Sequence, residues 1–240
     1  MVELCKKCNT EITQNYCPNC GHPRHLDRID AGYVLSEIIS VLNFQKGFLF
    51  TIKELLLRPG KSVRIFISED RSRLVKPIMF LLITSLVYTF LVQLLHFENM
   101  YVSYSDARHS TTLTIMNWVQ SNYGYANILM AVFIALWLKI FFRRSGVNVF
   151  EILILLSFVM GMGMLFYAAF GLMQSLVHVY LMQFGAMVAV IYTTYAIGQF
   201  FDKRKVTSYA KALWGYLLGM LTFLVAIIVV GTAIDWIFLK

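Results

Sequence analysis

The sequence predicts an all-α polytopic membrane protein, with five transmembrane helices that follow a small cysteine-containing segment. Its 240 residues are 58% hydrophobic with a mean hydropathy of +0.66, whereas soluble domains are roughly 45–50% apolar. The four cysteines all lie in the first 20 residues, and long runs without charged side chains follow them. These observations divide the chain into an N-terminal domain (1–25), amphipathic and basic juxtamembrane helices (31–76) and a five-helix membrane bundle (77–240).

The N-terminal domain has the ligand pattern of a structural zinc ribbon. Cys5-x2-Cys8 and Cys17-x2-Cys20 are two pairs, and each pair lets two thiolates reach one ion. Residues 1–20 contain no apolar signal-peptide core, so we expect this domain in the cytoplasm, where thiols stay reduced. Four thiolates complete the tetrahedral coordination of Zn²⁺. The pattern therefore predicts one structural, non-catalytic Zn²⁺ per chain.

Residues 31–58 predict amphipathic helix rather than linker or membrane span. Apolar side chains recur there with a helical period, and a narrow polar stripe that includes Thr51 and Glu54 runs to a helix end at Pro59-Gly60. Helices of this kind lie in the membrane interface or pack on neighbouring helices. The alternative is a small soluble hairpin with its own core.

A basic cluster connects this segment to the first span. We interpret it as a topology signal and as a contact for the headgroups of anionic membrane lipids. Aromatic and basic residues do not alternate in it as they do on stacking platforms, which argues against a nucleic-acid partner. The cluster consists of Lys61, Arg64, Arg71, Arg73 and Lys76.

Each of five apolar runs suits a bilayer that requires about 20 residues per helix. The third and fourth runs are nearly continuous and together would make about 78 Å of helix, so they predict a hairpin that turns near Gly171–Ser175. Residues 97–124 predict a polar loop on the outer side. The five runs are 77–95, 125–142, 149–172, 176–200 and 213–234.

The Lys and Arg residues agree with this span count, because cytoplasmic loops are enriched in them. Twelve of the 21 precede Pro77, three lie within 139–144 and four within 203–211, all on the cytoplasmic side if the N-terminus is inside. Only Arg108 and Lys240 fall on the outer side. The distribution predicts a cytoplasmic N-terminus and an external C-terminus.

The predicted spans carry no ionisable residue near their middle. Lys139 and Glu151 lie near cytoplasmic ends, Asp235 lies near an outer end, and His178 lies just inside the fourth span. Buried charges usually mark proton and ion pathways, so their positions favour structural helices. Small residues at packing intervals predict close helix contacts and are compatible with a homo-oligomer. These residues are Gly215 and Gly219 in the fifth span, and Gly185 and Ala189 in the fourth.

Three segments of the chain carry a resemblance to known proteins. They are the cysteine pairs with Cys17-Pro18-Asn19-Cys20-Gly21, then Phe48-x2-Thr51-x3-Leu55-Leu56-x-Arg58-Pro59-Gly60, then Glu69-Asp70-Arg71-Ser72-Arg73-Leu74-Val75-Lys76-Pro77. In this order they resemble a family of bacterial multipass membrane proteins that is known as a domain of unknown function and is common in Bacteroidetes. Where the family has Gly-Lys-Arg, this chain has Glu69-Asp70-Arg71. The resemblance implies a bacterial inner (cytoplasmic) membrane. Five spans behind a cytoplasmic region also look like the Yip-type trafficking proteins, in architecture alone.

We expect a non-enzymatic membrane protein whose zinc ribbon docks a cytoplasmic protein partner or organises the protein's own cytoplasmic face. An enzyme acting on lipid is disfavoured, because the sequence has no evident acid/base pair and no open metal site. The alternative is a channel or transporter for an uncharged or lipid-like substrate. Its path would be lined by Gln93, Ser157, Gln183, Thr193 and Gln199.

Overall fold

The computed structural model divides the chain into two compact units, Met1–Gln45 and Lys46–Lys240. The structure describes residues 3–4, 10–12, 15–16, 18–19, 47–71, 73–95 and 111–238. The predicted zinc ligands Cys5, Cys8, Cys17 and Cys20 lie outside the described residues. So do the first half of the predicted amphipathic segment and most of the predicted outer loop.

The first unit contains a short antiparallel pair of strands. β1 (Glu3–Leu4) pairs with β2 (Glu11–Ile12), and Leu4 lies opposite Glu11. The strands therefore bring together the two ends of the segment that holds the first cysteine pair.

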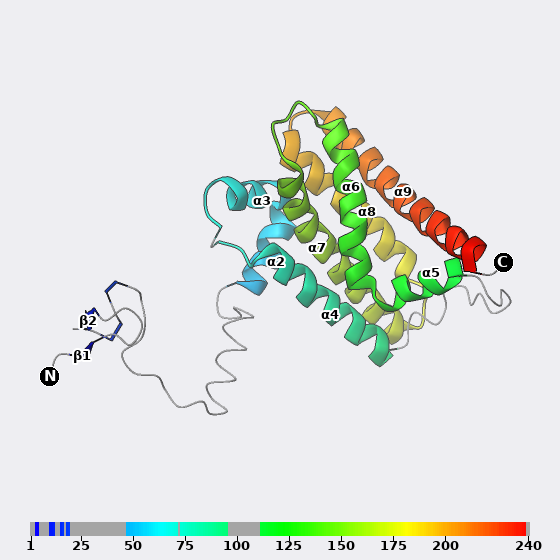
Figure 1. The fold of residues 1–240 in the computed structure, drawn as a ribbon, viewed down its shortest axis with the longest axis horizontal. Coiled ribbons are helices and arrows are strands. Elements are labelled where there is room, and N and C mark those ends of the chain that lie inside the picture. The colour runs from blue at the N-terminus through cyan, green and yellow to red at the C-terminus, as the bar shows by residue number, and fades with distance from the viewer. Residues whose placement is uncertain are drawn as a thin grey trace. The chain divides into compact units, whose positions relative to one another are not determined.

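The described part of the second unit is helical (Figure 1). A bundle forms because α4 packs on α7, α7 on α8, α8 on α9, and α9 on α6. Figure 1 shows α2 and α3 beside one end of this bundle and α5 beside the C-terminal part of α9. The helices are α2 (Phe48–Leu57), α3 (Pro59–Ser68), α4 (Pro77–Leu95), α5 (Thr111–Ser121), α6 (Tyr123–Phe141), α7 (Val149–Val177), α8 (Met182–Asp202) and α9 (Val206–Phe238).

Four of the described helices are long and apolar enough to cross a membrane. They correspond to the first, third, fourth and fifth predicted runs, and the bounds of α4 agree with the prediction at both ends. The second predicted run contains a shorter apolar stretch, Tyr125–Phe141. The four helices are Pro77–Leu95, Val149–Val177, Met182–Asp202 and Val206–Ile237.

The predicted turn at Gly171–Ser175 is wrong. The helix α7 continues to Val177 and ends at His178, which has left-handed dihedral angles (φ 59°, ψ 28°). The reason is a cap that hydropathy does not reveal: the Gln174 side-chain oxygen accepts the backbone N–H groups of Leu181 (2.9 Å) and Met182 (3.1 Å). These groups belong to the start of α8 and would otherwise lack helical partners. His178 consequently lies in the turn and not inside a span.

Two helices differ from the prediction because polar residues obscure the hydropathy pattern: one begins earlier than predicted, and the other was not predicted. The helix α9 begins at Val206. The apolar run predicted its start only at residue 213, because the first turns of α9 carry polar residues. Residues 111–121 were predicted as loop but form α5, and the Asp235 carboxylate accepts the Thr111 N–H at 3.0 and 3.2 Å. A carboxylate at a helix N-terminus accepts a hydrogen bond from a free backbone N–H group and interacts favourably with the positive end of the helix dipole.

A row of aromatic rings ties the short helices to the bundle. Phe48 of α2 lies 5.4 Å from Phe80 of α4, Phe80 lies 5.8 Å from Phe158 of α7, and Phe158 lies 5.4 Å from Phe66 of α3. All four rings are buried. Offset and edge-on ring pairs of this kind contribute about 0.5–1.5 kcal/mol each beyond their buried area.

Gly215 and Gly219 of α9 lie where this helix packs closely on α6. A Cβ on Gly219 would lie 2.5 Å from Ile134 Cα, and one on Gly215 would lie 2.7 Å from the Leu138 side chain. Between α7 and α8, a Cβ on Gly185 would meet Phe170 at 3.0 Å, and Ala189 is buried. Small residues thus occupy the tightest parts of two helix contacts, as is common in membrane bundles.

We predict that Gly219→Ala lowers the thermal stability of the purified protein, whereas Gly163→Ala does not. Alanine favours helix over glycine by about 1 kcal/mol, but overpacking costs about 1–3 kcal/mol or more where backbone must move. The nearest atom to a Cβ on Gly163 is 4.0 Å away, so this variant is the matched control. Size-exclusion chromatography after heating measures the apparent Tm; an unchanged Tm for Gly219→Ala would refute the close contact.

Candidate functional site

The end of the bundle beside α2 and α3 is built on an exchange of caps between α3 and α8. The Gln199 side-chain oxygen accepts the N–H of Gly60 at 2.8 Å and that of Lys61 at 3.3 Å, in the first turn of α3. In return, the Arg64 guanidinium of α3 donates to the carbonyls of Phe200 and Phe201, in the last turn of α8. Each helix therefore satisfies terminal backbone groups of the other.

Gly60 permits this exchange because a side chain does not fit there. A Cβ on Gly60 would lie 2.3 Å from the backbone nitrogen of Phe200 and 2.9 Å from the Ala196 carbonyl oxygen. Pro59 occupies the first position of α3, where its missing N–H costs nothing. The Arg58-Pro59-Gly60 sequence, predicted only as a helix end, thus ends α2 and also starts α3 against α8.

The polar stripe predicted on residues 47–58 faces protein. The Thr51 hydroxyl donates to the Gly47 carbonyl and accepts the Val75 N–H at 3.1 Å, and Thr51 is fully buried. The Glu54 carboxylate accepts the Ser62 hydroxyl at 2.9 Å and pairs with Arg73 at 3.2 Å. Together with the cap exchange, these contacts hold residues 47–76 as one folded segment, which we call the clamp.

The five predicted headgroup residues have different surroundings. Arg64 binds the α8 carbonyls, and Arg73 pairs with Glu54 while its guanidinium lies 5.9 Å from the Phe50 ring centre. Lys61, Arg71 and Lys76 are exposed. Two of the five cations therefore bind protein groups of the clamp or bundle, and three are available to other molecules.

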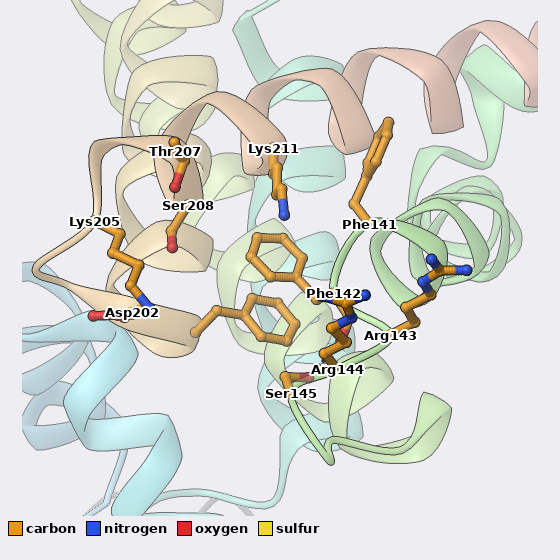
Figure 2. A pocket seen from close by; sticks show the side chains of 11 residues that line it. Phe141, Phe142, Arg143, Arg144, Ser145, Asp202, Lys205, Thr207, Ser208 and Lys211 are labelled. Carbon is orange, nitrogen blue, oxygen red and sulfur yellow. Dashed lines mark hydrogen bonds and ion pairs between the residues drawn. The ribbon is translucent and has the colours of Figure 1, made fainter.

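A pocket of about 510 Å³, which we call the basic pocket, lies at the same end of the bundle (Figure 2). Phe142 and Phe201 stack in it, with ring centres 3.8 Å apart and planes 5° apart. Figure 2 shows the Lys211 side chain extending from α9 toward the stacked rings. The pocket is lined by Phe141, Phe142, Arg143, Arg144, Ser145, Phe201, Asp202, Lys205, Thr207, Ser208 and Lys211.

The basic pocket carries an excess of positive charge. Its one carboxylate, on Asp202, pairs with Lys205 at 3.2 Å and accepts the Arg204 N–H at 3.0 Å. Arg143, Arg144 and Lys211 have no carboxylate within ion-pair distance among the residues that the structure describes. Electrostatically, the pocket therefore favours an anion.

A second pocket, of about 760 Å³, lies beside the cap exchange and shares Phe201 and Asp202 with the first. Its cations come from α3, from the residue before it and from the turn after α8, so both pockets flank the C-terminal end of α8. The charged residues of this second pocket are Arg58, Lys61, Arg64, Asp202, Lys203 and Arg204.

Sequence reasoning did not identify the basic pocket. It used Arg143, Arg144 and Lys205 only to predict which loops are cytoplasmic. It did not predict that the turns after α6 and α8 lie next to each other. The available signal was that each of these turns follows an apolar run and combines a terminal Phe with cations, at Phe142-Arg143-Arg144 and at Phe201 to Lys205.

The described interior of the bundle contains a small void. A void of only about 20 Å³ lies among α6, α7, α8 and α9, beside Asn127, Thr193 and Tyr216. This is close to the volume that holds one water molecule. Of the residues proposed to line a path, Gln199 caps α3 and the Ser157 hydroxyl donates to the Leu153 carbonyl of its own helix.

Ionisable residues near the helix ends have local partners. Lys139 donates to the Val147 carbonyl at 2.6 Å. Glu151 and Asn148 form a capping box at the start of α7, with both hydrogen bonds at 2.8 Å. Asp235 caps α5, as described above. These side chains fix the ends of helices, which accounts for their positions without ion transport.

A few described residues lie on both sides of the predicted zinc ligands. β1 and β2 flank the first cysteine pair, and the Asn19 side chain, between the second pair of cysteines, lies 3.4 Å from the Thr10 hydroxyl that follows the first. Within the described ranges, which exclude the four cysteines, no three His, Cys, Asp or Glu side chains gather at a metal site.

Comparison with known proteins gives one match. A family model, described as Protein of unknown function (DUF3667), matches residues 45–89. The matched residues cover the clamp and the first part of α4, and they include two of the three segments on which the resemblance was based. No curated protein and no solved structure matches the chain.

We predict that Gln199→Leu detaches α3 from α8. Two α3 N–H groups would lose their acceptor, at a cost of about 1–3 kcal/mol for each donor left buried. Gln183→Leu, an exposed glutamine on the same helix, is the matched control. Limited trypsin digestion followed by mass spectrometry is expected to show faster cleavage at Lys61 and Arg64 in Gln199→Leu alone. Equal cleavage in both variants would contradict the cap exchange.

Proposed function

We propose that this chain is a non-enzymatic multipass protein of a bacterial inner membrane, whose zinc ribbon docks a cytoplasmic protein partner. The observation that carries the proposal is the clamp. It fixes residues 47–76 to the end of the bundle where the Lys and Arg residues of the turns gather. The chain between the ribbon and α2 therefore leaves the folded bundle at its basic end, which is the cytoplasmic end by the charge rule.

The proposal includes a fifth membrane span formed by α6. Its apolar stretch, Tyr125–Phe141, would cover about 26 Å at 1.5 Å per residue, slightly less than the ~30 Å hydrocarbon core. It packs along α9 and α7, both long enough to span. A spanning α6 also places Arg143 and Arg144 on the same side as Lys203–Lys205, as their shared end of the bundle requires.

Reporter fusions test this topology. Fusions after Arg144 and after Lys205 are expected to report the cytoplasm, and fusions near Asp106 and after Lys240 the outside. The pair at Asp106 and Arg144 tests α6 alone, since both would report one side if α6 did not cross. That result would remove the fifth span from the proposal.

Loss of the zinc ligands is expected to separate docking from membrane insertion. Purified protein, kept reduced, should contain one Zn²⁺ per chain, and Cys17→Ser with Cys20→Ser should release it. Replacement of all four cysteines should leave the membrane level unchanged, because bundle helices satisfy their own backbone hydrogen bonds. Affinity capture with the intact ribbon, compared with this variant, measures which cytoplasmic proteins depend on the metal.

The control for this experiment is Gly215→Leu with Gly219→Leu, which damages the α6–α9 contact and should leave zinc content intact. Failure of the four-cysteine variant to insert, or capture of the same proteins by it, would contradict a separable docking domain. In that case the membrane helices would have to carry the function.

A further inference from the structure

The basic pocket combines an aromatic surface with a cationic surface. A small free anion would need only the cationic surface. Its aromatic part is the Phe142–Phe201 stack, where the buried Phe142 ring lies against Phe201 at 3.8 Å. Its polar part carries cations from two turns and from α9, and the Lys211 ammonium lies 5.9 Å from the Phe142 ring centre. An apolar wall beneath a cationic rim suits a molecule that has both an anionic group and a hydrocarbon part.

The polar part also offers hydrogen-bond donors. Ser208 lines the pocket, so its hydroxyl is a donor that a ligand there can reach. Thr207 and Ser208 belong to the first turn of α9, a helix of 33 residues whose dipole favours an anion at this end, although the Ser208 N–H donates to the Lys205 carbonyl at 2.9 Å. Cations, hydroxyls and a helix N-terminus are the usual ligands of phosphate.

The position of the pocket places it at the level of lipid headgroups. It lies at the ends of α6 and α8 and at the start of α9, and α8 and α9 are apolar enough to span a membrane. On α9, Trp214 is 60% exposed one turn beyond Lys211. Exposed tryptophan next to lysine at the end of a span is typical of the membrane–water interface.

We infer that the basic pocket binds the phosphate of an anionic phospholipid headgroup. Lys211, Arg144 and the Ser208 hydroxyl contact the phosphate, and the Phe142–Phe201 stack contacts the apolar part of the lipid. The excess positive charge excludes zwitterionic lipids, because a choline group would be repelled by the rim. This inference goes beyond the docking proposal and does not depend on the zinc ribbon, so the two can fail independently.

Native mass spectrometry of the full chain in neutral detergent tests the site. Phosphatidylglycerol, phosphatidylcholine and inorganic phosphate are the three probes, added separately and then in competition. We expect one phosphatidylglycerol to be retained per chain. Lys211→Gln and Arg144→Gln should each weaken this binding by about tenfold or more, the effect of losing one charge-assisted hydrogen bond. Ser208→Ala should weaken it by a smaller factor.

The matched control is Lys53→Gln, which removes an exposed cation from α2, away from the pocket. It should bind phosphatidylglycerol as the unaltered chain does. Equal retention of phosphatidylcholine would overturn the inference, as would equal weakening by Lys53→Gln and Lys211→Gln. Displacement of the lipid by millimolar inorganic phosphate would also overturn it, since the pocket would then be a small-anion site. All the substituted cations are exposed, so size-exclusion profiles should match across the variants.

Discussion

A helix that ends at a membrane surface must find partners for its last backbone polar groups, and in this protein the partners come from other helices. Gln199 serves the start of α3, Arg64 the end of α8, Gln174 the start of α8, and Asp235 the start of α5. Each bond satisfies a terminal group and also fixes where two elements meet. The packing of α3 combines these caps with apolar contact, since the helix also buries Val63 and Phe66.

The clamp shows how such caps combine with packing. Fully buried Thr51 and Leu55 join α2 to Val75 and, through the Leu55 carbonyl, to the Tyr192 hydroxyl at 3.0 Å. On the apolar side of the clamp, the row of aromatic rings from Phe48 to Phe66 packs α2 and α3 against α4 and α7. The segment matched by the family model, residues 45–89, therefore consists of the clamp and the first part of α4, on which Phe48 of the clamp packs. Its Pro-Gly sequence is explained by geometry, since no Cβ fits at Gly60.

The sequence alone predicted the bundle to the extent that hydropathy determines it. The bounds of α4 follow from Pro77 and an uninterrupted apolar run. The range 31–76 was predicted to hold juxtamembrane helices without the bounds of α3, and α5 was missed, because basic and polar residues dilute the apolar positions of both helices. The turn after α7 depends on one glutamine side chain, and nothing in the local pattern distinguishes Gln174 from other glutamines. The basic pocket requires knowing that α6 lies beside α9, which brings Arg144 and Lys211 together from distant parts of the chain. The clamp and the cysteine pattern were recognised as motifs, but the contacts that explain the clamp were not.

The unequal lengths of α6 and α9 have a consequence for the surrounding bilayer. Between Lys211 and Asp235, α9 presents an uncharged stretch of about 36 Å, whereas Tyr125–Phe141 of α6 covers about 26 Å. In the proposed five-span topology, one of these neighbours is longer and the other shorter than the ~30 Å hydrocarbon core, so α9 must tilt or the lipid beside α6 must thin. In that topology, a change in membrane thickness would act on the contact between α6 and α9, which is close at Gly219.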